Sequence, residues 1–250
     1  MTRTVLITGC SSGFGLETAR YFLDRDWQVV ATMRTPRTDL LPASPRLRVL
    51  ALDVTDPRSI AHAVEAAGPI DVLVNNAGFG AASPAELTPL ATVRQLFETN
   101  TFGTLALMQA VLPQFRQRRA GVVVNVTSSV TLKALPLIAA YRASKMAVNA
   151  FTESMAIELE PLGVRLRLVL PGRSPETRFG DNARPNMAGF DHGDYAELAR
   201  KVFAEFQDTS APTTHALDVA EAVWRAATDP AAPMRIPAGA DAVAWAAEAR

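Results

Sequence analysis

The sequence has little of what disulfides, metal centres and charged binding faces require. Its 250 residues include one cysteine, Cys10, and three histidines, and none of these has the paired spacing of metal ligands. The 25 basic residues balance the 25 acidic ones, so no net charge attracts nucleic acid or an anionic membrane. We therefore expect no internal disulfide, no metal, and neither nucleic acid nor a membrane as partner.

Long apolar runs are missing as well. No stretch reaches membrane-spanning length, and the chain passes from Met1 into a strand-like segment without the pattern of a secretory signal. A single cysteine is typical of a protein from a reducing compartment. Together these absences predict a soluble cytoplasmic protein.

Short β-branched segments alternate with segments of helical periodicity along most of the chain. The apolar segments at 70–76 and 121–128 are typical of central strands that helices cover on both faces. Expected strands lie at 4–8, 28–33, 47–53, 70–76, 121–128, 164–172 and 234–237, and expected helices at 13–25, 141–162 and 215–229, with another ending near residue 119. The alternation predicts a Rossmann-like, doubly wound parallel α/β sheet of about seven strands in one domain, 1–250.

The composition changes after Pro171. Residues 173–214 are rich in Gly, Pro, Asn and Asp, with a helical stretch at 195–208. In open α/β sheets ligands bind beyond the carboxyl ends of the strands, so this long connection is interpreted as a substrate loop or lid. A mobile surface loop is the alternative interpretation.

The stretch ITGCSSGFG, residues 7–15, admits two interpretations. As G-x-S-x-G it would make Ser11 the nucleophile of a hydrolase. That hypothesis is weak, because no earlier strand supplies an oxyanion-hole loop, and the three histidines fall in a helix, a flexible loop and a helix start: His62, His192 and His215.

As a phosphate-binding loop, the same stretch has a suitable context of strand, glycine turn and amphipathic helix. Gly9 would permit the tight turn, Gly13 the approach of N–H groups to a pyrophosphate, and Gly15 close packing of the helix. The spacing G-x-x-x-G-x-G departs from G-x-G-x-x-G, so the loop alone does not decide the function.

Further motifs follow this loop in a fixed order. Thr8 directly precedes the first glycine, Gly9. Farther along the chain, Asn75 to Gly78 read N-N-A-G, and Tyr141 to Lys145 read Y-x-x-x-K. With Asn100, Ser128 and Pro171-Gly172 added, residues 2–230 resemble the short-chain dehydrogenase/reductase family. The resemblance implies an oxidoreductase that moves a hydride between a nicotinamide cofactor and a carbonyl or secondary alcohol.

The resemblance implies that Asn100, Ser128, Tyr141 and Lys145 are the catalytic residues. Tyr141 and Lys145 are four residues apart and share a helix face, so an ammonium can favour the phenolate of a tyrosine whose ordinary pKa is about 10. Tyr141 is therefore the expected acid/base. Ser128, chosen over its neighbours Thr127 and Ser129 by the family spacing, would donate to the substrate oxygen. Asn100 would hold a water that connects the lysine to solvent.

Cofactor choice is argued from the end of the second strand, which carries Arg34. An arginine there accommodates a 2′-phosphate, so NADP(H) is favoured, with NAD(H) as the alternative and Arg37 as an alternative contact. Asp53 resembles an adenine contact, or else caps the following helix. The implied cofactor-binding residues are Gly9, Ser11, Ser12, Gly13, Phe14, Gly15, Arg34, Asp53, Val54, Asn76, Ala77, Gly78, Tyr141, Lys145, Pro171, Gly172 and Ser174.

One segment departs from the family pattern. A threonine is expected five residues after Pro171, but Glu176 stands there and Thr177 comes next, so the contact of this loop with the carboxamide is uncertain. Arg173 places a cation near the site, as a substrate handle or a partner of Glu176. Several apolar side chains suggest an apolar pocket, although such residues are also typical of a core: Leu132, Leu135, Leu137, Phe179, Met187 and Phe190.

The resemblance also implies a homodimer or homotetramer, assembled through the helices around 101–119 and 141–161. The substrate is expected to be an apolar small molecule whose identity the sequence does not give. A second functional hypothesis is a catalytically silent, dinucleotide-binding regulatory protein. The presence of all four expected catalytic residues argues against it.

Overall fold

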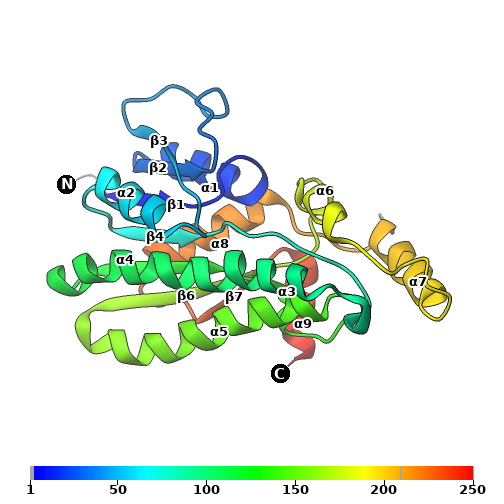
Figure 1. Cartoon of the computed structure of the whole chain (residues 1–250). Coiled ribbons are helices and arrows are strands. Elements are labelled where there is room, and N and C mark those ends of the chain that lie inside the picture. The colour runs from blue at the N-terminus through cyan, green and yellow to red at the C-terminus, as the bar shows by residue number, and fades with distance from the viewer. Residues whose placement is uncertain (1–2, 209, 250) are drawn as a thin grey trace.

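The centre of the structure, a computed structural model that describes residues 3–208 and 210–249, is a sheet of seven parallel strands. Their order is β3-β2-β1-β4-β5-β6-β7 (Figure 1). The strands are β1 (Thr4–Ile7), β2 (Gln28–Met33), β3 (Leu47–Ala51), β4 (Val72–Asn75), β5 (Gly121–Val126), β6 (Val164–Pro171) and β7 (Arg235–Ala238). The predicted fold class is confirmed, and most strands end somewhat earlier than expected.

The helices connect these strands and cover both faces of the sheet. They are α1 (Gly13–Leu23), α2 (Pro57–Ala67), α3 (Leu90–Phe97), α4 (Gly103–Arg118), α5 (Ala139–Leu159), α6 (Phe179–Ala183), α7 (Ala196–Gln207), α8 (Ala216–Thr228) and α9 (Ala240–Glu248). Between α3 and α4 the chain forms a π-helical turn, η2 (Glu98–Phe102). Among the described residues no helix is both long and apolar enough to span a bilayer.

Alternate residues of the central strands enter two separate cores. Val5 and Ile7 of β1 face α1 and α8, where they pack with Phe22 and other buried side chains. Leu6, between them, faces the opposite side and packs in the cluster of α2, α4 and α5 that includes Phe115. Because successive strand residues point to opposite faces and both faces are covered, β4 and β5 are apolar apart from Asn75 and Asn125, as the sequence predicted for central strands.

The strand order reverses beside β1. β1 pairs with β2 on one side and with β4 on the other, so the connections after β1 and after β4 leave the sheet in opposite directions. A crevice at the carboxyl ends of such strands is the usual ligand site of an open α/β sheet. The fold therefore directs attention to the loops that follow β1, β4, β5 and β6.

A buried polar connection joins this part of the sheet to α5. Asn75 Nδ2 donates to Asn125 Oδ1 at 2.8 Å, and Asn125 Nδ2 donates to Thr152 Oγ1, also at 2.8 Å. A buried amide left without partners would cost about 1–3 kcal/mol, so this chain of bonds fixes the rotation of α5 against β4 and β5. The same helix carries Tyr141 and Lys145.

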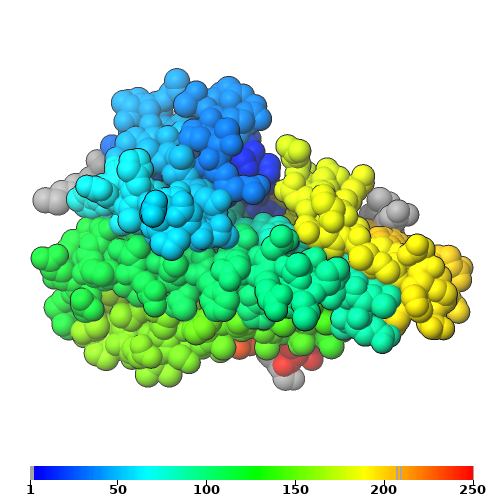
Figure 2. Space-filling view, viewed as in Figure 1, coloured from blue at the N-terminus to red at the C-terminus, as the bar shows by residue number. Residues whose placement is uncertain are grey.

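The segment after β6 carries α6 and α7, which project beyond the carboxyl edge of the sheet, away from the N-terminus (Figure 1). The helix predicted at 195–208 is present as α7. The five-residue helix α6 was not expected, because Gly180, Asp181 and Asn182 within it have low helix propensity. In the space-filling view, a recess separates this yellow segment from the blue residues around β2 and β3 (Figure 2).

Candidate active site

The glycine loop after β1 has the backbone that its sequence predicted. Gly9 and Gly13 have φ angles of 74° and 55°, in the left-handed region that favours glycine. A Cβ at Gly15 would meet the carbonyl oxygen of Gly9 and would lie 2.5 Å from Asn76 Nδ2. α1 therefore begins close against the loop, as the prediction for Gly15 required.

The amino end of α1 is open to a ligand. Its N-cap residue, Ser12, makes no side-chain capping bond, and the first turn carries no acidic residue. The first N–H groups of a helix have no partner within the helix and carry a partial positive charge, which favours a phosphate. Ser11 lies exposed beside this end, and Phe14 packs inward against the core.

Thr8 and Asn76 tie the glycine loop to the loop after β4. Thr8 Oγ1 accepts from the backbone N–H groups of Asn76 and Ala77, each at 2.9 Å. In return, Asn76 Nδ2 donates to the carbonyl oxygen of Thr8 at 2.9 Å. Thr8 was not among the predicted site residues, although the motif contains it. Its signal is a hydroxyl at the last position of a buried strand, where a polar side chain needs a partner.

Asn100 lies in the π-helical turn η2, where its side chain joins the loop after β4 to helix α5. Its Oδ1 accepts from the N–H of Phe79 at 3.0 Å, and its Nδ2 donates to the Phe79 carbonyl and to Ser144 Oγ, each at 3.0 Å. A Cβ at Gly78 would lie 2.9 Å from Asn100 Oδ1 and 3.2 Å from Lys145 Nζ, so the three residues are in close proximity. Ser144, which sequence reasoning missed, completes this cluster from α5.

Tyr141 is buried near the start of α5, with 7% of its surface exposed. Burial raises the pKa of Tyr141 to about 12, and a hydrogen bond with the Ser128 side chain acts in the opposite direction. Ser128 follows β5, and its Oγ accepts from the N–H of Val130 at 3.3 Å. Its own hydroxyl proton is thereby left for another acceptor.

Lys145 lies one helical turn after Tyr141, and 5% of it is exposed. Its Nζ donates to the carbonyl oxygen of Val126 at 3.1 Å. Burial lowers the pKa of Lys145 to about 8, because an ammonium loses its hydration in this position. The structure thus brings together Asn100, Ser128, Tyr141 and Lys145 from three parts of the chain: η2, the end of β5 and α5.

Arg34 and Arg37, which follow the end of β2, differ in whether an acidic side chain already pairs with them. Arg37 forms two hydrogen bonds with the Asp39 carboxylate, at 2.6 and 3.3 Å. Arg34 is exposed, and no hydrogen bond or ion pair of its guanidinium occurs among the described residues. The guanidinium of Arg34 is therefore available to an anion, whereas that of Arg37 is paired.

Asp53 does not cap the helix that follows it, so the alternative interpretation of this residue was wrong. The N-cap of α2 is Asp56, whose side chain accepts from the N–H of Arg58. Asp53 Oδ1 instead accepts from the backbone and the hydroxyl of Thr55, and these bonds lower the pKa of Asp53 below its ordinary value. The next residue, Val54, lies against Gly103 at the start of α4.

The end of β6 is held by the last part of the chain. The N–H of Arg173 donates to Asp241 Oδ2 at 2.6 Å, and the N–H of Gly172 donates to Thr214 Oγ1 at 2.9 Å. Thr214 Oγ1 in turn donates to Asp241 Oδ1 at 2.7 Å. The turn after Pro171 is therefore fixed by Asp241 of α9 and by Thr214, two residues before the start of α8, and sequence reasoning identified neither.

The proposed pairing of Arg173 with Glu176 was wrong. The Arg173 guanidinium donates to the carbonyl oxygens of Phe206 and Asp208, at 2.5 and 2.7 Å. Glu176 turns the other way: its carboxylate lies 3.1 Å from His215 Nδ1 and accepts from the N–H of Ala216 at 2.6 Å. The first N–H groups of a helix have no acceptor within the helix, and the Glu176 carboxylate accepts from that of Ala216 at the amino end of α8.

Thr177, and not Glu176, reaches the glycine loop. A Cβ at Gly13 would lie 3.3 Å from the Cβ of Thr177. The extra residue before this threonine is accommodated by a turn in which the N–H of Thr177 donates to the Ser174 carbonyl at 3.3 Å. Ser174 Oγ is itself buried without a hydrogen-bond partner among the described residues.

The apolar residues named from the sequence do not form one group. Leu137 and Phe190 pack with α7, in a cluster with Ala199 and Val202. Leu135 packs in a different cluster, which contains Tyr141, and Phe179 stacks on the Tyr141 ring. Only this second group borders the residues at the carboxyl edge.

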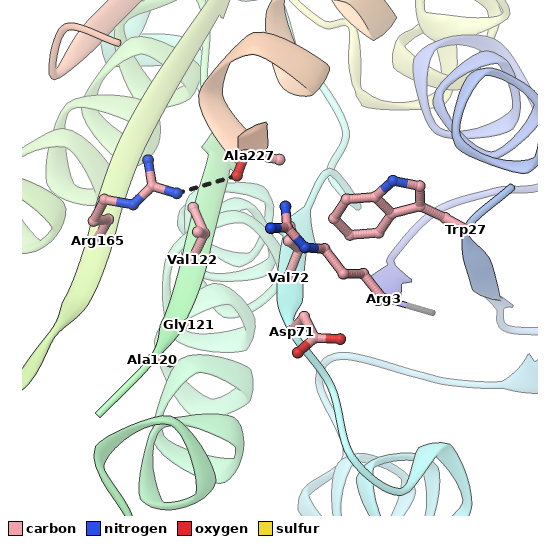
Figure 3. A pocket seen from close by; sticks show the side chains of 9 residues that line it. All are labelled: Arg3, Trp27, Asp71, Val72, Ala120, Gly121, Val122, Arg165 and Ala227. Atoms are coloured by element: carbon pink, nitrogen blue, oxygen red, sulfur yellow. Dashed lines mark hydrogen bonds between the residues drawn. The ribbon is translucent and has the colours of Figure 1, made fainter. Parts of the chain in front are cut away.

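A hollow of about 200 Å³ lies at the opposite edge of the sheet (Figure 3). Arg3, Asp71, Val122 and Arg165, from around the amino ends of β1, β4, β5 and β6, contribute to its lining together with Trp27. A strand rises about 3.3 Å per residue, so the length of a strand separates this hollow from Ser128 and Tyr141. We therefore do not assign the reaction to it.

A parallel sheet with this strand order, an open helix end beside three glycines and a buried tyrosine–lysine pair defines a Rossmann-like dinucleotide-binding oxidoreductase. A sequence model described as short chain dehydrogenase matches residues 3–188. The chain belongs to the short-chain dehydrogenase family.

Similar proteins support the same assignment. Retinol dehydrogenase 8 of Homo sapiens is 38% identical over 224 residues, which cover 85% of this chain and 67% of that protein. A short-chain dehydrogenase from Streptomyces avermitilis is 31% identical, with a TM-score of 0.85 over 99% of this chain and 92% of the other. A Burkholderia cenocepacia short chain dehydrogenase in complex with NADP is 27% identical, with a TM-score of 0.78 over 98% and 92%.

Replacing Gly15 by alanine tests the glycine loop. The added methyl group meets the Gly9 carbonyl and Asn76 Nδ2, and overpacking of this kind costs about 1–3 kcal/mol. We expect the dissociation constant for NADPH and NADH, measured by fluorescence titration, to rise about tenfold or more. Gly193→Ala is the control, because no atom lies within 4 Å of a Cβ there. Unchanged binding by the Gly15 variant would contradict this account.

Proposed function

We propose that the protein is an NADP(H)-dependent oxidoreductase that interconverts a carbonyl group and a secondary alcohol on an apolar small molecule. The observation that carries the proposal is the buried group of Ser128, Tyr141 and Lys145 at the carboxyl edge of the sheet, next to the open end of α1. A catalytically silent binding protein is not favoured, because such a protein has no need to bury an ammonium beside a phenol at a cost in hydration.

The site fits a dinucleotide. Gly9, Gly13 and Gly15 let the loop pack closely on Asn76, Ala77 and Thr177, and the amino end of α1 has no side-chain cap and no acidic residue to oppose a phosphate. The Ser174 Oγ, two residues after Gly172, is buried without a hydrogen-bond partner among the described residues. When bound, the nicotinamide ring supplies or accepts the hydride. The proposed contacts are Gly9, Ser11, Ser12, Gly13, Phe14, Gly15, Arg34, Asp53, Val54, Asn76, Ala77, Gly78, Tyr141, Lys145, Pro171, Gly172 and Ser174.

Tyr141 is the proposed acid and base. In carbonyl reduction its hydroxyl donates a proton to the substrate oxygen, and in alcohol oxidation its phenolate accepts that proton. A pKa of about 12 suits the acid, but the base requires a lower value. The ammonium of Lys145 stabilises the phenolate and so lowers that value when it is charged, which its own pKa of about 8 permits at neutral pH.

Ser128 and Asn100 serve this proton transfer in different ways. Ser128 Oγ accepts from the N–H of Val130, and its hydroxyl, which hydrogen-bonds Tyr141 here, would donate to the substrate oxygen when substrate binds and orient that oxygen toward Tyr141. Both groups of the Asn100 amide already bind Phe79 and Ser144, so its side chain positions the loop after β4. We propose that its backbone carbonyl, in a π-helical turn of the kind often found at functional sites, holds a water leading to Lys145.

The proposed substrate is apolar because the side chains around Tyr141 are. Ala81, Leu96 and Ile138 are buried with it, and Phe79, Val130 and Leu135 pack against this group. The similarity to retinol dehydrogenase 8, whose name gives an apolar alcohol as its substrate, supports the same class of substrate.

Residues 173–214 would serve as the lid over this site. The whole chain, 1–250, would form a single domain, and the protein would act in the cytoplasm.

Tyr141→Phe tests the mechanism. Removing the hydroxyl should lower kcat about 10²–10⁴-fold, because no other group is placed to move the proton. A panel of ketones and alcohols, followed by nicotinamide absorbance, provides the measurement, and dinucleotide binding should persist. Tyr21→Phe on α1 is the matched control and should keep full turnover. Equal turnover of the Tyr141 variant and the wild type would disprove the proposed role.

Arg34→Ala tests the cofactor preference. A guanidinium bound to a phosphate contributes about 1.5–3 kcal/mol, so its loss should raise KM for NADPH about tenfold or more and leave KM for NADH nearly unchanged. Arg37→Ala is the matched control, since Asp39 already pairs with that arginine. The preference for NADP(H) fails if NADH supports faster turnover of the wild-type enzyme, or if both variants behave alike.

We propose a homodimer or homotetramer that forms through α4 and α5, which lie side by side (Figure 1). Apolar side chains are exposed on η2 and α5 next to this face: Phe102, Met146, Phe151 and Ile157. Ile157, 76% exposed, is the most accessible of them. Ile157→Arg should therefore reduce the mass measured by light scattering, whereas Val243→Arg on α9 should not. An unchanged mass for the first variant would place the interface elsewhere.

A further inference from the structure

Phe179, the first residue of α6, covers the ring of Tyr141. The two ring centroids lie 5.6 Å apart with an angle of 56° between the planes. This is a tilted aromatic contact of the kind that stabilises a structure beyond the apolar area it buries. Yet 39% of Phe179 remains exposed, so the ring lies between the buried tyrosine and solvent.

The other side of the Phe179 ring rests on a glycine. A Cβ at Gly80, in the loop after β4, would lie 2.8 Å from Phe179 Cζ, and Ala183 Cβ lies near the same point. The absence of a side chain at Gly80 is therefore what lets the ring lie so close to the backbone. Phe179 thus touches two parts of the site at once, the tyrosine and the loop that carries Gly78.

The chain segment that contains Phe179 is hydrogen-bonded to the rest of the protein on both sides of Phe179, but hardly at Phe179 itself. Glu176 binds the N–H of Ala216, and the N–H of Ala188 donates to the Ala82 carbonyl at 3.3 Å. Between these points, the N–H of Phe179 has only a 3.5 Å contact with Thr177 Oγ1. The contacts of the Phe179 ring with Tyr141 and Gly80, together with the buried Ala183, therefore hold α6 against the rest of the protein.

We propose that Phe179 determines specificity for substrates that carry an aromatic or similarly planar apolar ring next to the carbonyl end. A substrate oxygen within reach of Tyr141 and Ser128 places its substituents where the Phe179 ring now meets Tyr141 and Gly80. A planar ring takes over the contact that Phe179 makes with Tyr141 and packs against Phe179 itself. A short aliphatic group is too small to do both.

This inference rests on the proposed function and adds the substrate class. It accounts for three observations together. The partly exposed Phe179 ring lies against Tyr141, Gly80 lies against the Phe179 ring, and the apolar Leu135 and Ile138 pack in the same cluster as Tyr141. A purely structural phenylalanine would be expected to lie inside the core of the lid, as Phe190 does against Phe203.

The test compares 4-phenyl-2-butanone with 2-butanone. In the wild type the phenyl ketone should have the higher kcat/KM, and Phe179→Ala should lower the ratio of the two values about tenfold, the scale of one aromatic contact. Phe179→Leu should restore part of the ratio. Phe206→Ala is the matched control, an exposed phenylalanine of α7 in the same segment, and should keep the wild-type ratio.

A second measurement does not depend on turnover. Isothermal titration of 4-phenyl-2-butanone into the protein saturated with NADP⁺ should show binding that Phe179→Ala weakens and Phe206→Ala does not. Equal losses for both ketones, or binding unaffected by Phe179→Ala, would overturn the inference. If the wild type reduces neither ketone nor any other panel member, the proposed function fails, and the titration still decides the role of Phe179.

Discussion

The bond between the Thr8 hydroxyl and two N–H groups of the next loop is the constraint on which the site depends. It joins the ends of β1 and β4, the neighbouring strands between which the chain changes direction. Gly15 can pack under Gly9, and Gly78 can approach Asn100 and Lys145, only because these two loops are held at a fixed separation. The glycine loop and the loop that packs against Asn100 and Lys145 are thus joined through one hydroxyl oxygen that accepts two hydrogen bonds.

Burial acts on the two main titratable groups of the site in complementary ways. It raises the pKa of Tyr141 and lowers that of Lys145, since both charged forms lose hydration. Without the other, each group would stay neutral over more of the pH range. Placed one helical turn apart, they compensate for this loss, because each charge stabilises the opposite one. The helix that holds them is fixed by the buried amides of Asn75 and Asn125.

Features that depend on local spacing could be predicted from the sequence, and features that depend on distant loops could not. The Tyr141–Lys145 pair follows from helical geometry, and the apolar strands from their composition. Nothing local indicates that Arg173 binds carbonyl oxygens near the end of α7, or that Glu176 caps α8. The contact of Phe179 with Tyr141 is of the same kind, since α6 has too few residues for a periodic pattern.

The hydrogen bonds of Asp241 with Arg173 and Thr214 have a consequence for how the protein folds. Residues from α9 complete the turn at the end of β6, although α9 follows β6 only after a long stretch of chain. Domains fold while the chain emerges, amino end first, so most of the sheet can form before this carboxylate exists. The turn after Pro171 therefore takes its final form only after α9 has been synthesised. A prematurely terminated chain would contain every residue of the tyrosine–lysine pair and still lack a finished site.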